Sequence, residues 1–462
     1  MIPLYSHRND TVLVVGLGKS GLSAARALST AGARVFVWDD KAEQRDSALV
    51  NGFTIFDAES GDMTELDHVI WSPGVPHTHP TPHPLAEKAR AAKHTLRCDV
   101  DLLATAQPSA TFVGITGTNG KSTTTALTAH VLTEAGKQVE VGGNLGFTAL
   151  DLAPLGADGI YVLELSSYQT ELTPNLHCAT AVLLNITPDH LERHGGIDGY
   201  VAAKSELFAH QKYGALAIVG EDDVPSRTTA QYLAGDGRHL VIRISAESDP
   251  ADGVSVRDGV LNDNHFDQGG TIDLRSLKAL PGKHNWQNAA AAYAIARTNG
   301  VSSEVITKAF ASFTGLRHRQ EIIGTMQDVT FVNDSKATNV DATEKALSCY
   351  GSVYWIAGGV AKAGGITALG PLFGRIRHAF LIGESAQDFA TELSQGGVAA
   401  STHPTLEDAT INAGHQALED RTKDATVLLS PACSSFDMFK NFEERGDAFR
   451  SAVLDTWPEV AA

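Results

Sequence analysis

The stretch Thr111-Phe-Val-Gly-Ile-Thr116-Gly-Thr-Asn-Gly-Lys121-Ser-Thr-Thr-Thr125 decides the fold of this chain. Its first residues, 111–115, form a short apolar run that is typical of a buried β-strand, and a helix is expected over about 122–135. Between them lies a glycine-bearing turn that ends in Lys-Ser-Thr, a combination that binds phosphate groups. Glycines let backbone N–H groups approach a phosphate, and the N-terminus of the helix adds a positive dipole.

This turn is the Gly-Thr-x-Gly-Lys-Ser/Thr variant of the phosphate-binding motif. The strict motif has a further glycine five residues before its Gly-Lys pair, where this chain has Ile115. The motif predicts that Lys121 reaches the β- and γ-phosphates of a nucleotide and that Ser122 or Thr123 ligates Mg²⁺. An ordinary glycine-rich turn is the alternative, and Gly-Lys-Ser-Thr directly after a strand makes it the weaker interpretation.

Length and composition limit the class of protein. A chain of 462 residues is too long for one hydrophobic core, so several domains are expected. The net charge of −18 disfavours nucleic acid as a partner. No apolar run approaches the length of a membrane-spanning helix, and no membrane partner is expected. The four cysteines lie far apart at Cys98, Cys178, Cys349 and Cys433, which favours a reducing compartment and a cytoplasmic location.

A second glycine turn, Gly16-Leu-Gly-Lys-Ser-Gly21, lies near the start of the chain. It follows a predicted strand at 11–15, and the next predicted strand, 33–38, ends at Asp39-Asp40, roughly 20 positions on. This arrangement predicts a Rossmann-like unit and raises the hypothesis of NAD binding. A tight strand–helix turn that binds no ligand is the alternative.

Two further features belong to this N-terminal region. Ser72-Pro-Gly74 follows a predicted strand at 68–71, and open α/β sheets bind ligands at such carboxyl ends. Three histidines then occur among prolines at 77–84. The prolines favour an extended, solvated loop over a metal site, because histidine metal ligands usually lie on ordered elements.

The central region places acidic, imidazole and amine groups after strands. Glu164 ends an apolar strand that begins at Gly159; an unpaired carboxylate is costly to bury, so its position predicts a Mg²⁺ ligand, with a structural ion pair as the alternative. His190 follows the next strand, and this place favours a functional role over that of a core histidine. A helix over 198–211 carries Lys204. From 226 to 280 we expect only short strands and turns, without recognisable chemistry.

Asn285 and Asn288 are three residues apart, so they share one face at the start of an alanine-rich helix. A boundary is expected near 313–319, because strands and helices alternate again beyond it. The predicted strands 329–332, 353–357, 379–382 and 426–429 indicate a third α/β domain with a parallel sheet. The loops 333–339, 358–362 and 430–436 carry lysines and hydroxyls that suit a carboxylate-bearing substrate; loop solvation and helix capping are the alternative.

The sequence therefore predicts an α/β protein of three domains. We expect a Rossmann-like N-terminal domain over 1–107, a central P-loop-type ATPase domain over 108–314 and a C-terminal Rossmann-like α/β domain over 315–462. Closure of the third domain on binding is expected, with hinges near 105–110 and 312–318.

Five motifs in fixed order make the chain resemble the Mur ligase family across essentially its whole length. They are Gly-Thr-Asn-Gly-Lys-Ser-Thr, Glu-Leu-Ser-Ser-Tyr-Gln, Asn-Ile-Thr-Pro-Asp-His-Leu, His-Asn-x-x-Asn and Asn-Asp-Ser-Lys-Ala-Thr-Asn. The last of these, at 333–339, and the segment 430–446 resemble the family member that adds D-glutamate. The first domain would then bind a UDP-substrate and not NAD. The second domain would bind ATP, and the third would bind the amino acid.

The resemblance implies an ATP-dependent amide ligase of cytoplasmic peptidoglycan synthesis. It would add D-glutamate to UDP-MurNAc-L-Ala (UDP-N-acetylmuramoyl-L-alanine) through an acyl phosphate and release ADP and phosphate. The implied cofactors are ATP, Mg²⁺ at two sites and a carbamylated Lys204, and a monomer is expected. A sister Mur ligase or a folylpolyglutamate synthase-like ligase with another amine is the alternative. An NAD-dependent oxidoreductase would leave the phosphate loop without a role, and a non-catalytic nucleotide switch would tolerate Lys204→Ala.

The resemblance also assigns residues, group by group. The implied catalytic residues are Lys121, Glu164, His190 and Lys204, and the implied metal ligands are Ser122, Glu164, His190 and Lys204 as its carbamate. The implied ATP contacts are Gly117, Thr118, Asn119, Gly120, Lys121, Ser122, Thr123, Asn285, Asn288, Arg319 and Asp334. The implied contacts of the UDP-substrate are Lys19, Ser20, Asp39, Asp40, Lys41, Ser72, Gly74, Asn144, Ser166 and Gln169. The implied D-glutamate contacts are Lys336, Thr338, Lys362, Ser435, Phe436 and Phe442.

Overall fold

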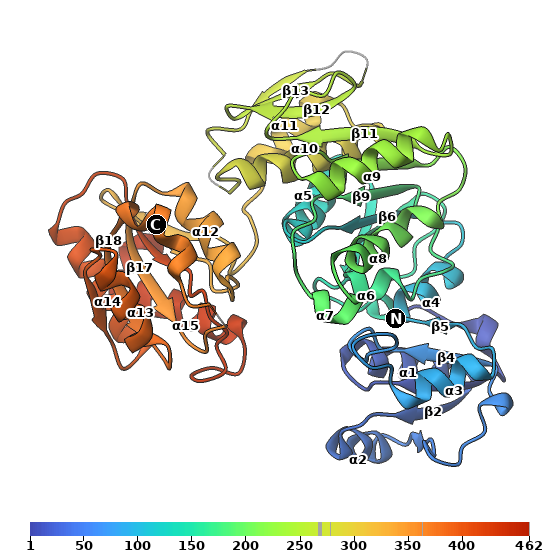
Figure 1. Cartoon of the computed structure of the whole chain (residues 1–462). Helices are drawn as coiled ribbons and strands as arrows, with labels where there is room; N and C mark the ends of the chain where they lie inside the picture. Colours follow the sequence, from blue (N-terminus) through green and yellow to red (C-terminus); the bar gives the residue numbers. More distant parts are fainter. Residues whose placement is uncertain (267–269, 278, 363, 462) are drawn as a thin grey trace. The chain divides into compact units, whose positions relative to one another are not determined.

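The computed structural model describes residues 1–266, 270–277, 279–362 and 364–461. These residues form an α/β protein with three sheets (Figure 1). The chain divides into two compact units: Met1–Leu274 with Asn285–Ser312, and Arg275–His284 with Phe313–Ala462. The boundary predicted near 313–319 thus coincides with a boundary between the units, while the first two sheets belong to one unit.

The first sheet is parallel, with the strand order β3-β2-β1-β4-β5 expected of a Rossmann-like unit. Its central strand β1 is apolar and buried at four of five positions, as a strand covered on both faces should be. The strands are β1 (Thr11–Val15), β2 (Arg34–Trp38), β3 (Thr54–Ile55), β4 (His68–Trp71) and β5 (Leu96–Arg97). The helices are η1 (Tyr5–His7), α1 (Lys19–Ala31), α2 (Ala42–Val50), η2 (Met63–Glu65), α3 (Pro84–Ala91) and α4 (Asp99–Ala106).

The second sheet has the order β14-β13-β12-β11-β10-β9-β6-β8-β7, with an antiparallel end at β12–β14. Strand β6 lies between β8 and β9, so the phosphate loop that follows it has a strand end on either side. The strands are β6 (Thr111–Thr116), β7 (Gln138–Gly143), β8 (Gly159–Glu164), β9 (Thr180–Leu183), β10 (Leu216–Gly220), β11 (Leu240–Ser245), β12 (Gly253–Arg257), β13 (Val260–Asp263) and β14 (Thr271–Asp273). The helices are α5 (Lys121–Glu134), η3 (Ala149–Asp151), α6 (Ser167–Thr170), α7 (Leu191–His194), α8 (Ile197–Ala209), α9 (Val224–Gly235), α10 (Lys283–Thr298) and α11 (Ser303–Ser312).

Helix α9 corrects the prediction of strands and turns from residue 226 onward. Asp223 caps this helix by accepting a hydrogen bond from Ser226 N, and Pro225 occupies its first turn. Ala230 and Leu233 are buried. The cap and the proline were visible in the sequence, but the apolar face is too sparse to reveal a helix by periodicity.

The third sheet has the order β15-β16-β20-β17-β18-β19 and forms the second unit. All its pairs are parallel except β15–β16, so the predicted parallel sheet is correct for the four expected strands and gains an antiparallel edge. The strands are β15 (Glu321–Met326), β16 (Val329–Asn333), β17 (Ser352–Gly358), β18 (Ile376–Ile382), β19 (Ala400–Thr402) and β20 (Ala425–Leu429). The helices are α12 (Val340–Cys349), η4 (Thr367–Arg375), α13 (Ala386–Gln395), α14 (Leu406–Glu419), α15 (Phe442–Thr456) and η5 (Pro458–Ala461).

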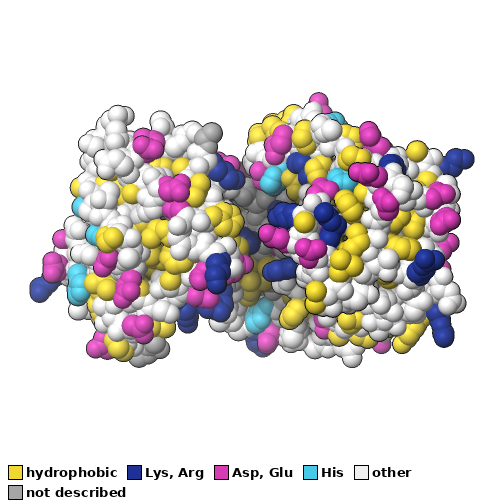
Figure 2. Space-filling view, turned by 90° about the horizontal axis from the view of Figure 1, so that it is seen from below, with side chains coloured by type: hydrophobic (Ala, Val, Ile, Leu, Met, Phe, Trp, Pro, Cys, Tyr) yellow, Lys and Arg dark blue, Asp and Glu magenta, His cyan; other side chains and the backbone are white. Residues whose placement is uncertain are grey.

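Each unit has its own buried apolar side chains. In the first unit one core continues from the first sheet into the second, and Ile2 N donates a hydrogen bond to Leu150 O at 2.7 Å. In the second unit the sheet has a core on each face, because Tyr354 and Ile356 belong to one cluster and Trp355 to the other. No helix in the described part of the chain is long and apolar enough to cross a bilayer. Figure 2 shows acidic side chains spread over the face that it draws.

Candidate active site

The phosphate loop joins β6 to α5 and uses two glycines in conformations that side chains rarely adopt. The φ angles are 149° at Gly117 and 87° at Gly120. Lys121 Nζ donates to the carbonyl oxygens of Gly117 at 2.9 Å and Thr118 at 2.8 Å. The ammonium group is therefore held against the loop at the N-terminus of α5, a combination that suits a polyanion.

Asn185, just after β9, clamps the loop from the neighbouring strand. Asn119 N donates to Asn185 Oδ1 at 2.9 Å, and Asn185 Nδ2 donates back to Asn119 O at 3.1 Å. The same Nδ2 donates to Gln287 Oε1 at 3.2 Å, and Gln287 Nε2 donates to Asp222 Oδ2 at 2.9 Å. Asn185 begins the motif Asn-Ile-Thr-Pro-Asp-His-Leu, but no role could be predicted for it, because reciprocal side chain–backbone pairing depends on the folded loop.

Three predicted residues meet beside the loop. Glu164 ends β8 and is only 3% exposed; its Oε2 accepts a hydrogen bond from Ser122 Oγ at 2.5 Å. Its Oε1 accepts a hydrogen bond from Asn144 Nδ2 at 2.9 Å. Thr123 follows Ser122 in the first turn of α5. Both partners of the carboxylate are neutral, so these contacts are not a structural ion pair. A hydroxyl and a carboxylate at the end of a phosphate loop are hard oxygen donors of the kind that Mg²⁺ prefers.

Lys204 on α8 is buried next to the same loop. Its Nζ donates to Gly117 O at 2.8 Å and lies 4.5 Å from the centroid of the Tyr200 ring. Burial, together with the nearby Lys121 charge, lowers the pKa of Lys204 well below its ordinary value, and Asp189 opposes this only in part. Burial beside a second lysine therefore favours the neutral form of the Lys204 amine.

His190 lies at the N-cap of α7 with a positive φ of 51°. Its Nε2 is 3.6 Å from Asp189 Oδ2, and its ring centroid is 5.3 Å from that of Tyr168. About half of the side chain is exposed (49%). The structure thus places His190 on an accessible loop after β9, and its role as a metal ligand stays a prediction.

Asn285 and Asn288 lie on one face of α10, as the spacing predicted. Asn288 Nδ2 donates to Asn285 Oδ1 at 3.1 Å, and Asn288 Oδ1 accepts from Thr124 Oγ1 at 3.2 Å. A β-carbon built on Gly120 would lie only 2.1 Å from Asn288 Oδ1. The start of α10 therefore packs directly against the phosphate loop.

The residues predicted for the UDP-substrate gather mainly at the carboxyl ends of β1, β2 and β4. Ser20 Oγ and Ser72 Oγ are 3.3 Å apart across this end. Asp39 accepts hydrogen bonds from Leu17 N at 2.7 Å and Lys41 N at 2.9 Å, so its carboxylate organises the turn itself. Lys19, Asp40, Lys41 and Gly74 are exposed.

The predicted pair Ser166 and Gln169 lies elsewhere, at the start of α6. Ser166 N donates to Gln169 Oε1 at 3.0 Å, and Gln169 N donates to Ser166 Oγ at 3.3 Å, a reciprocal capping box. Arg193 approaches the first sheet from the central one, because its Nη1 donates to Gly74 O at 3.1 Å.

The expectation of a solvated loop is wrong for His77. This side chain is buried and lies 3.4 Å from Glu171, which is also 3.5 Å from His194. Burial alone would raise the pKa of Glu171, but hydrogen bonds and charge from His194 and His77 lower it to about 2. The prolines did predict an extended path. The burial of His77 could not be predicted, because its acidic partner Glu171 lies almost a hundred positions away in the sequence.

In the second unit, Asp334 follows β16 and is buried. Its Oδ2 accepts from Ser430 Oγ at 2.9 Å, and its Oδ1 accepts from Gln320 N at 3.1 Å. Burial raises the pKa of Asp334 to about 7, against the smaller effects of these hydrogen bonds and of Arg319. Asp334 and Arg319 thus lie at one end of the sheet.

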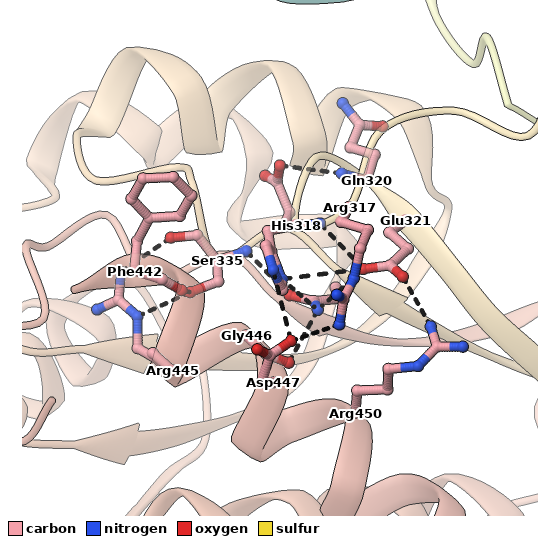
Figure 3. Close-up of polar contacts among 12 residues, drawn as sticks. Arg317, His318, Gln320, Glu321, Ser335, Phe442, Arg445, Gly446, Asp447 and Arg450 are labelled. Carbon is pink, nitrogen blue, oxygen red and sulfur yellow. Dashed lines mark hydrogen bonds and ion pairs between the residues drawn. The ribbon is translucent and has the colours of Figure 1, made fainter. Parts of the chain in front are cut away.

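Arg445 joins the predicted amino-acid loops of this unit (Figure 3). Its Nε donates to Ser335 Oγ at 3.0 Å, and its Nη2 donates to Ser335 O at 2.9 Å and Cys433 O at 3.0 Å. Lys336 Nζ lies 4.4 Å from the centroid of the Phe442 ring. Arg445 lies in the segment 430–446, but its role could not be predicted from the sequence, because only the fold shows that one guanidinium spans two loops.

The remaining predicted residues of this unit differ in exposure. Ser435 is buried, while Phe436 beside it is 74% exposed, and Lys362 is exposed as well. Thr338 follows Lys336 and donates its backbone N–H to Lys336 O at 2.8 Å. The structure therefore gathers Lys336, Phe442 and the 430–436 loop around Arg445 and leaves Lys362 and Phe436 facing solvent.

Comparison with known proteins agrees with this geometry. Residues 115–296 match the family model of the Mur ligase middle domain, and residues 10–92 match that of the MurD-like N-terminal domain of Mur ligases. The chain is 52% identical over 453 residues to the UDP-N-acetylmuramoylalanine–D-glutamate ligase of Paramagnetospirillum magneticum, and the alignment covers 98% of each chain. The chain belongs to the Mur ligase family. The enzyme of the same name from Rhodospirillum rubrum is 49% identical, over 98% of this Mur ligase and 96% of the relative.

Solved structures of Mur ligases share the fold. UDP-N-acetylmuramate-alanine ligase MurC from Thermotoga maritima has a TM-score of 0.58 at 17% identity, covering 97% of this chain and 100% of that one. MurF ligase from the same organism, in complex with ADP, has a TM-score of 0.58 at 17% identity, with coverages of 99% and 98%. The resemblance inferred from the motifs is confirmed. An NAD-dependent oxidoreductase is the wrong interpretation of the first glycine turn, since that segment matches a Mur ligase domain.

Proposed function

We propose that this Mur ligase joins D-glutamate to UDP-MurNAc-L-Ala in an ATP-dependent step of peptidoglycan synthesis. The relatives at 52% and 49% identity, aligned over nearly the whole chain, carry the name of that D-glutamate ligase. One structural observation supports an ATP-dependent reaction more than any other. Ser122 contacts Glu164 beside the phosphate loop, and Lys121 lies against the same loop.

The chemistry explains why such a site is needed. A carboxylate is a poor electrophile, so the γ-phosphoryl group of ATP is first transferred to the free carboxylate of the UDP-substrate, which gives an acyl phosphate and ADP. The amine of D-glutamate then attacks the acyl carbon, and the tetrahedral intermediate expels phosphate to leave an amide. Two anions must approach each other in the first step, and the Lys121 ammonium with the N-terminus of α5 supplies positive charge there.

The residues present fit a divalent cation. Ser122 Oγ and the Glu164 carboxylate would hold one Mg²⁺, and His190 with a modified Lys204 would hold a second. Bound Mg²⁺ would neutralise charge on the transferring phosphoryl group. As an ammonium, Lys204 would repel a cation. A neutral amine can instead add to CO₂ and lose a proton to form a carbamate, and the lowered pKa of Lys204 supports this carbamylation.

The other assignments extend the proposal to the substrates. Asn285 and Asn288 would contact the adenine side of ATP, and Arg319 and Asp334 would contact the γ-phosphate and ribose. The contacts of the UDP-substrate would be those around Ser20 and Ser72, with Asn144, Ser166 and Gln169 from the central sheet. Lys336, Thr338, Lys362, Ser435, Phe436 and Phe442 would bind D-glutamate. We further propose a cytoplasmic monomer with the domain limits 1–107, 108–314 and 315–462.

A phosphate-release assay tests the proposal. Purified protein with Mg²⁺, ATP and UDP-MurNAc-L-Ala is supplied in turn with D-glutamate, L-glutamate, L-lysine, meso-diaminopimelate and glycine, and ADP and orthophosphate are measured. D-glutamate should give by far the largest release, with Lys121→Ala as the inactive control. Release that depends on another amine would favour a sister ligase, and no release with any acceptor would refute the reaction class.

A further inference from the structure

Three potential metal ligands meet at the amino end of the first sheet, outside the residues assigned to the ligase reaction. His7 Nδ1 is 3.0 Å from Asp10 Oδ2, and His68 Nε2 is 3.2 Å from the same oxygen. The three ligand atoms all lie within 4.8 Å of one another. His7 ends η1, Asp10 precedes β1, and His68 begins β4.

The backbone fixes this arrangement. Asp10 N donates to His7 O at 3.1 Å, which closes the turn between the two ligands, and Arg34 N donates to Asp10 O at 2.8 Å. His68 pairs in register with Val12, two residues beyond Asp10. The positions of all three ligands are therefore set by the turn and by the β1–β4 and β1–β2 strand pairs, as a preformed site requires.

We propose that His7, Asp10 and His68 bind a divalent first-row transition-metal ion, with Zn²⁺ as the reference ion. Two imidazoles and one carboxylate are a ligand set that Zn²⁺ accepts with water in the fourth position. Tetrahedral bonds of the usual length separate ligand atoms by about 3.3 Å, so the two distances to Asp10 need to change by only a few tenths of an ångström. The His7 and His68 nitrogens lie within 4.8 Å of each other and would have to approach to the same separation. The side chains of His68 and Asp10 are 33% and 27% exposed, which gives an ion access from solvent.

The electrostatic surroundings keep the imidazole of His68 available. Burial, and then the charges of Arg97 and His7, lower the pKa of His68, while Asp10 and Asp67 oppose this. A neutral imidazole is the form that binds a metal. The Arg97 guanidinium also disfavours a cation, but Asp101 lies 3.8 Å from it and offsets part of its charge. Without an ion, both imidazoles can instead donate hydrogen bonds to Asp10.

The site would stabilise the N-terminal segment and not the reaction. Ile2 and Leu4 are buried, and Ile2 N donates to Leu150 O, so this segment connects the first sheet to the central one. A metal ion shared by η1 and β4 would hold the segment in place. Ser72 and Gly74, proposed for the UDP-substrate, lie beyond the opposite end of β4.

Metal titration of the full-length chain tests the site. Chelator-treated protein is titrated with Zn²⁺ alone and with Co²⁺ alone, comparing the parent with His68→Gln, Asp10→Asn and the control His415→Gln, an exposed histidine on α14. We expect the parent and the control to bind one more ion than His68→Gln, or to bind it at least about tenfold more tightly. The parent with Co²⁺ should show the visible absorption of a low-symmetry, nitrogen- and oxygen-ligated ion, and its Tm should rise with Zn²⁺.

Folding and activity serve as independent checks. Circular dichroism and ligase activity of His68→Gln should match the parent, because this residue lies outside the proposed active site. Equal stoichiometry and affinity in the parent, His68→Gln and Asp10→Asn would overturn the proposal and leave a His–Asp–His hydrogen-bond cluster. Since the readout is metal binding, its failure would leave the proposed ligase activity untouched.

Discussion

Lys204 Nζ donates a hydrogen bond to Gly117 O at 2.8 Å, an oxygen that also accepts a hydrogen bond from Lys121 Nζ at 2.9 Å. Two lysines on one carbonyl oxygen cannot both carry a full charge without strong repulsion. Lys121 is partly exposed, whereas Lys204 is buried, so the repulsion and the burial lower the pKa of Lys204. The contact of Lys204 with the phosphate loop thus supports the proposed carbamylation, which needs a neutral amine.

Lys204→Ala should lower the rate of phosphate release by about a hundredfold or more, since it removes the proposed negatively charged carbamate and with it a Mg²⁺ ligand. Short carboxylic acids such as acetate should restore part of the activity by occupying the place of the proposed carbamate. The assay is phosphate release with and without added acetate. Lys212→Ala, at an exposed position just after α8, is the control and should keep the parental rate. Unchanged activity of Lys204→Ala would contradict both the carbamate and the catalytic role.

Glu164→Gln should raise the Mg²⁺ concentration needed for half-maximal activity by at least about tenfold, because an amide oxygen is a much weaker ligand than a carboxylate. The amide can still bond to Ser122 and Asn144, so the fold should be retained. The measurement is the initial rate as a function of Mg²⁺ at saturating ATP. Glu134→Gln, at the exposed far end of α5, provides a matched control. An identical Mg²⁺ dependence in Glu164→Gln would remove Glu164 from the metal site.

The sequence predicted most of what is local or follows from parallel-sheet topology. Lys121 and Ser122 belong to one strand–loop–helix motif, and Glu164 could be placed beside them because β6 and β8 are parallel and end at the same edge. The contacts of Asn185 and Arg445 were not predicted, although Asn185 lies in one of the five motifs and Arg445 in the segment 430–446. Each of these side chains bonds to backbone atoms of a distant segment, and periodicity and spacing carry no information on such partners.

The difference between local signals and long-range contacts also explains the errors in the predicted fold. Helix α9 has a clear cap but an apolar face of few residues, so the cap alone could not outweigh the many glycines and aspartates that follow. The antiparallel strand β15 begins at Glu321, just beyond the predicted boundary at 313–319, and its pairing with β16 depends on tertiary structure. His77 became a buried partner of Glu171 only because the first two sheets share one core.

Asp334→Asn should flatten the pH dependence of stability between about pH 4 and pH 7. The folded-state pKa of Asp334 is raised from 3.8 to about 7, so the folded state retains a proton that the unfolded state releases, and stability falls as pH rises through this window. A rise of the pKa from 3.8 to about 7 corresponds to at most about 4 kcal/mol in the free energy of unfolding. Urea unfolding at pH 5 and pH 8 measures the effect: the parent should lose more stability than the variant. Equal losses would show that Asp334 ionises normally in the folded protein.

Gly120→Ala should weaken ATP binding by about tenfold or more, because displacement of a phosphate loop by even an ångström disturbs positioning. The new β-carbon would lie 2.1 Å from Asn288 Oδ1, and the φ of 87° is strained for alanine. Gly136→Ala separates these two effects. Its φ is 76°, but no atom lies within 4 Å of the added carbon, so this control carries the backbone strain without the collision. Calorimetric titration with ATP and Mg²⁺ should show near-parental affinity for Gly136→Ala and a clear loss for Gly120→Ala. If both variants bind ATP equally well, α10 does not hold the loop in its binding conformation.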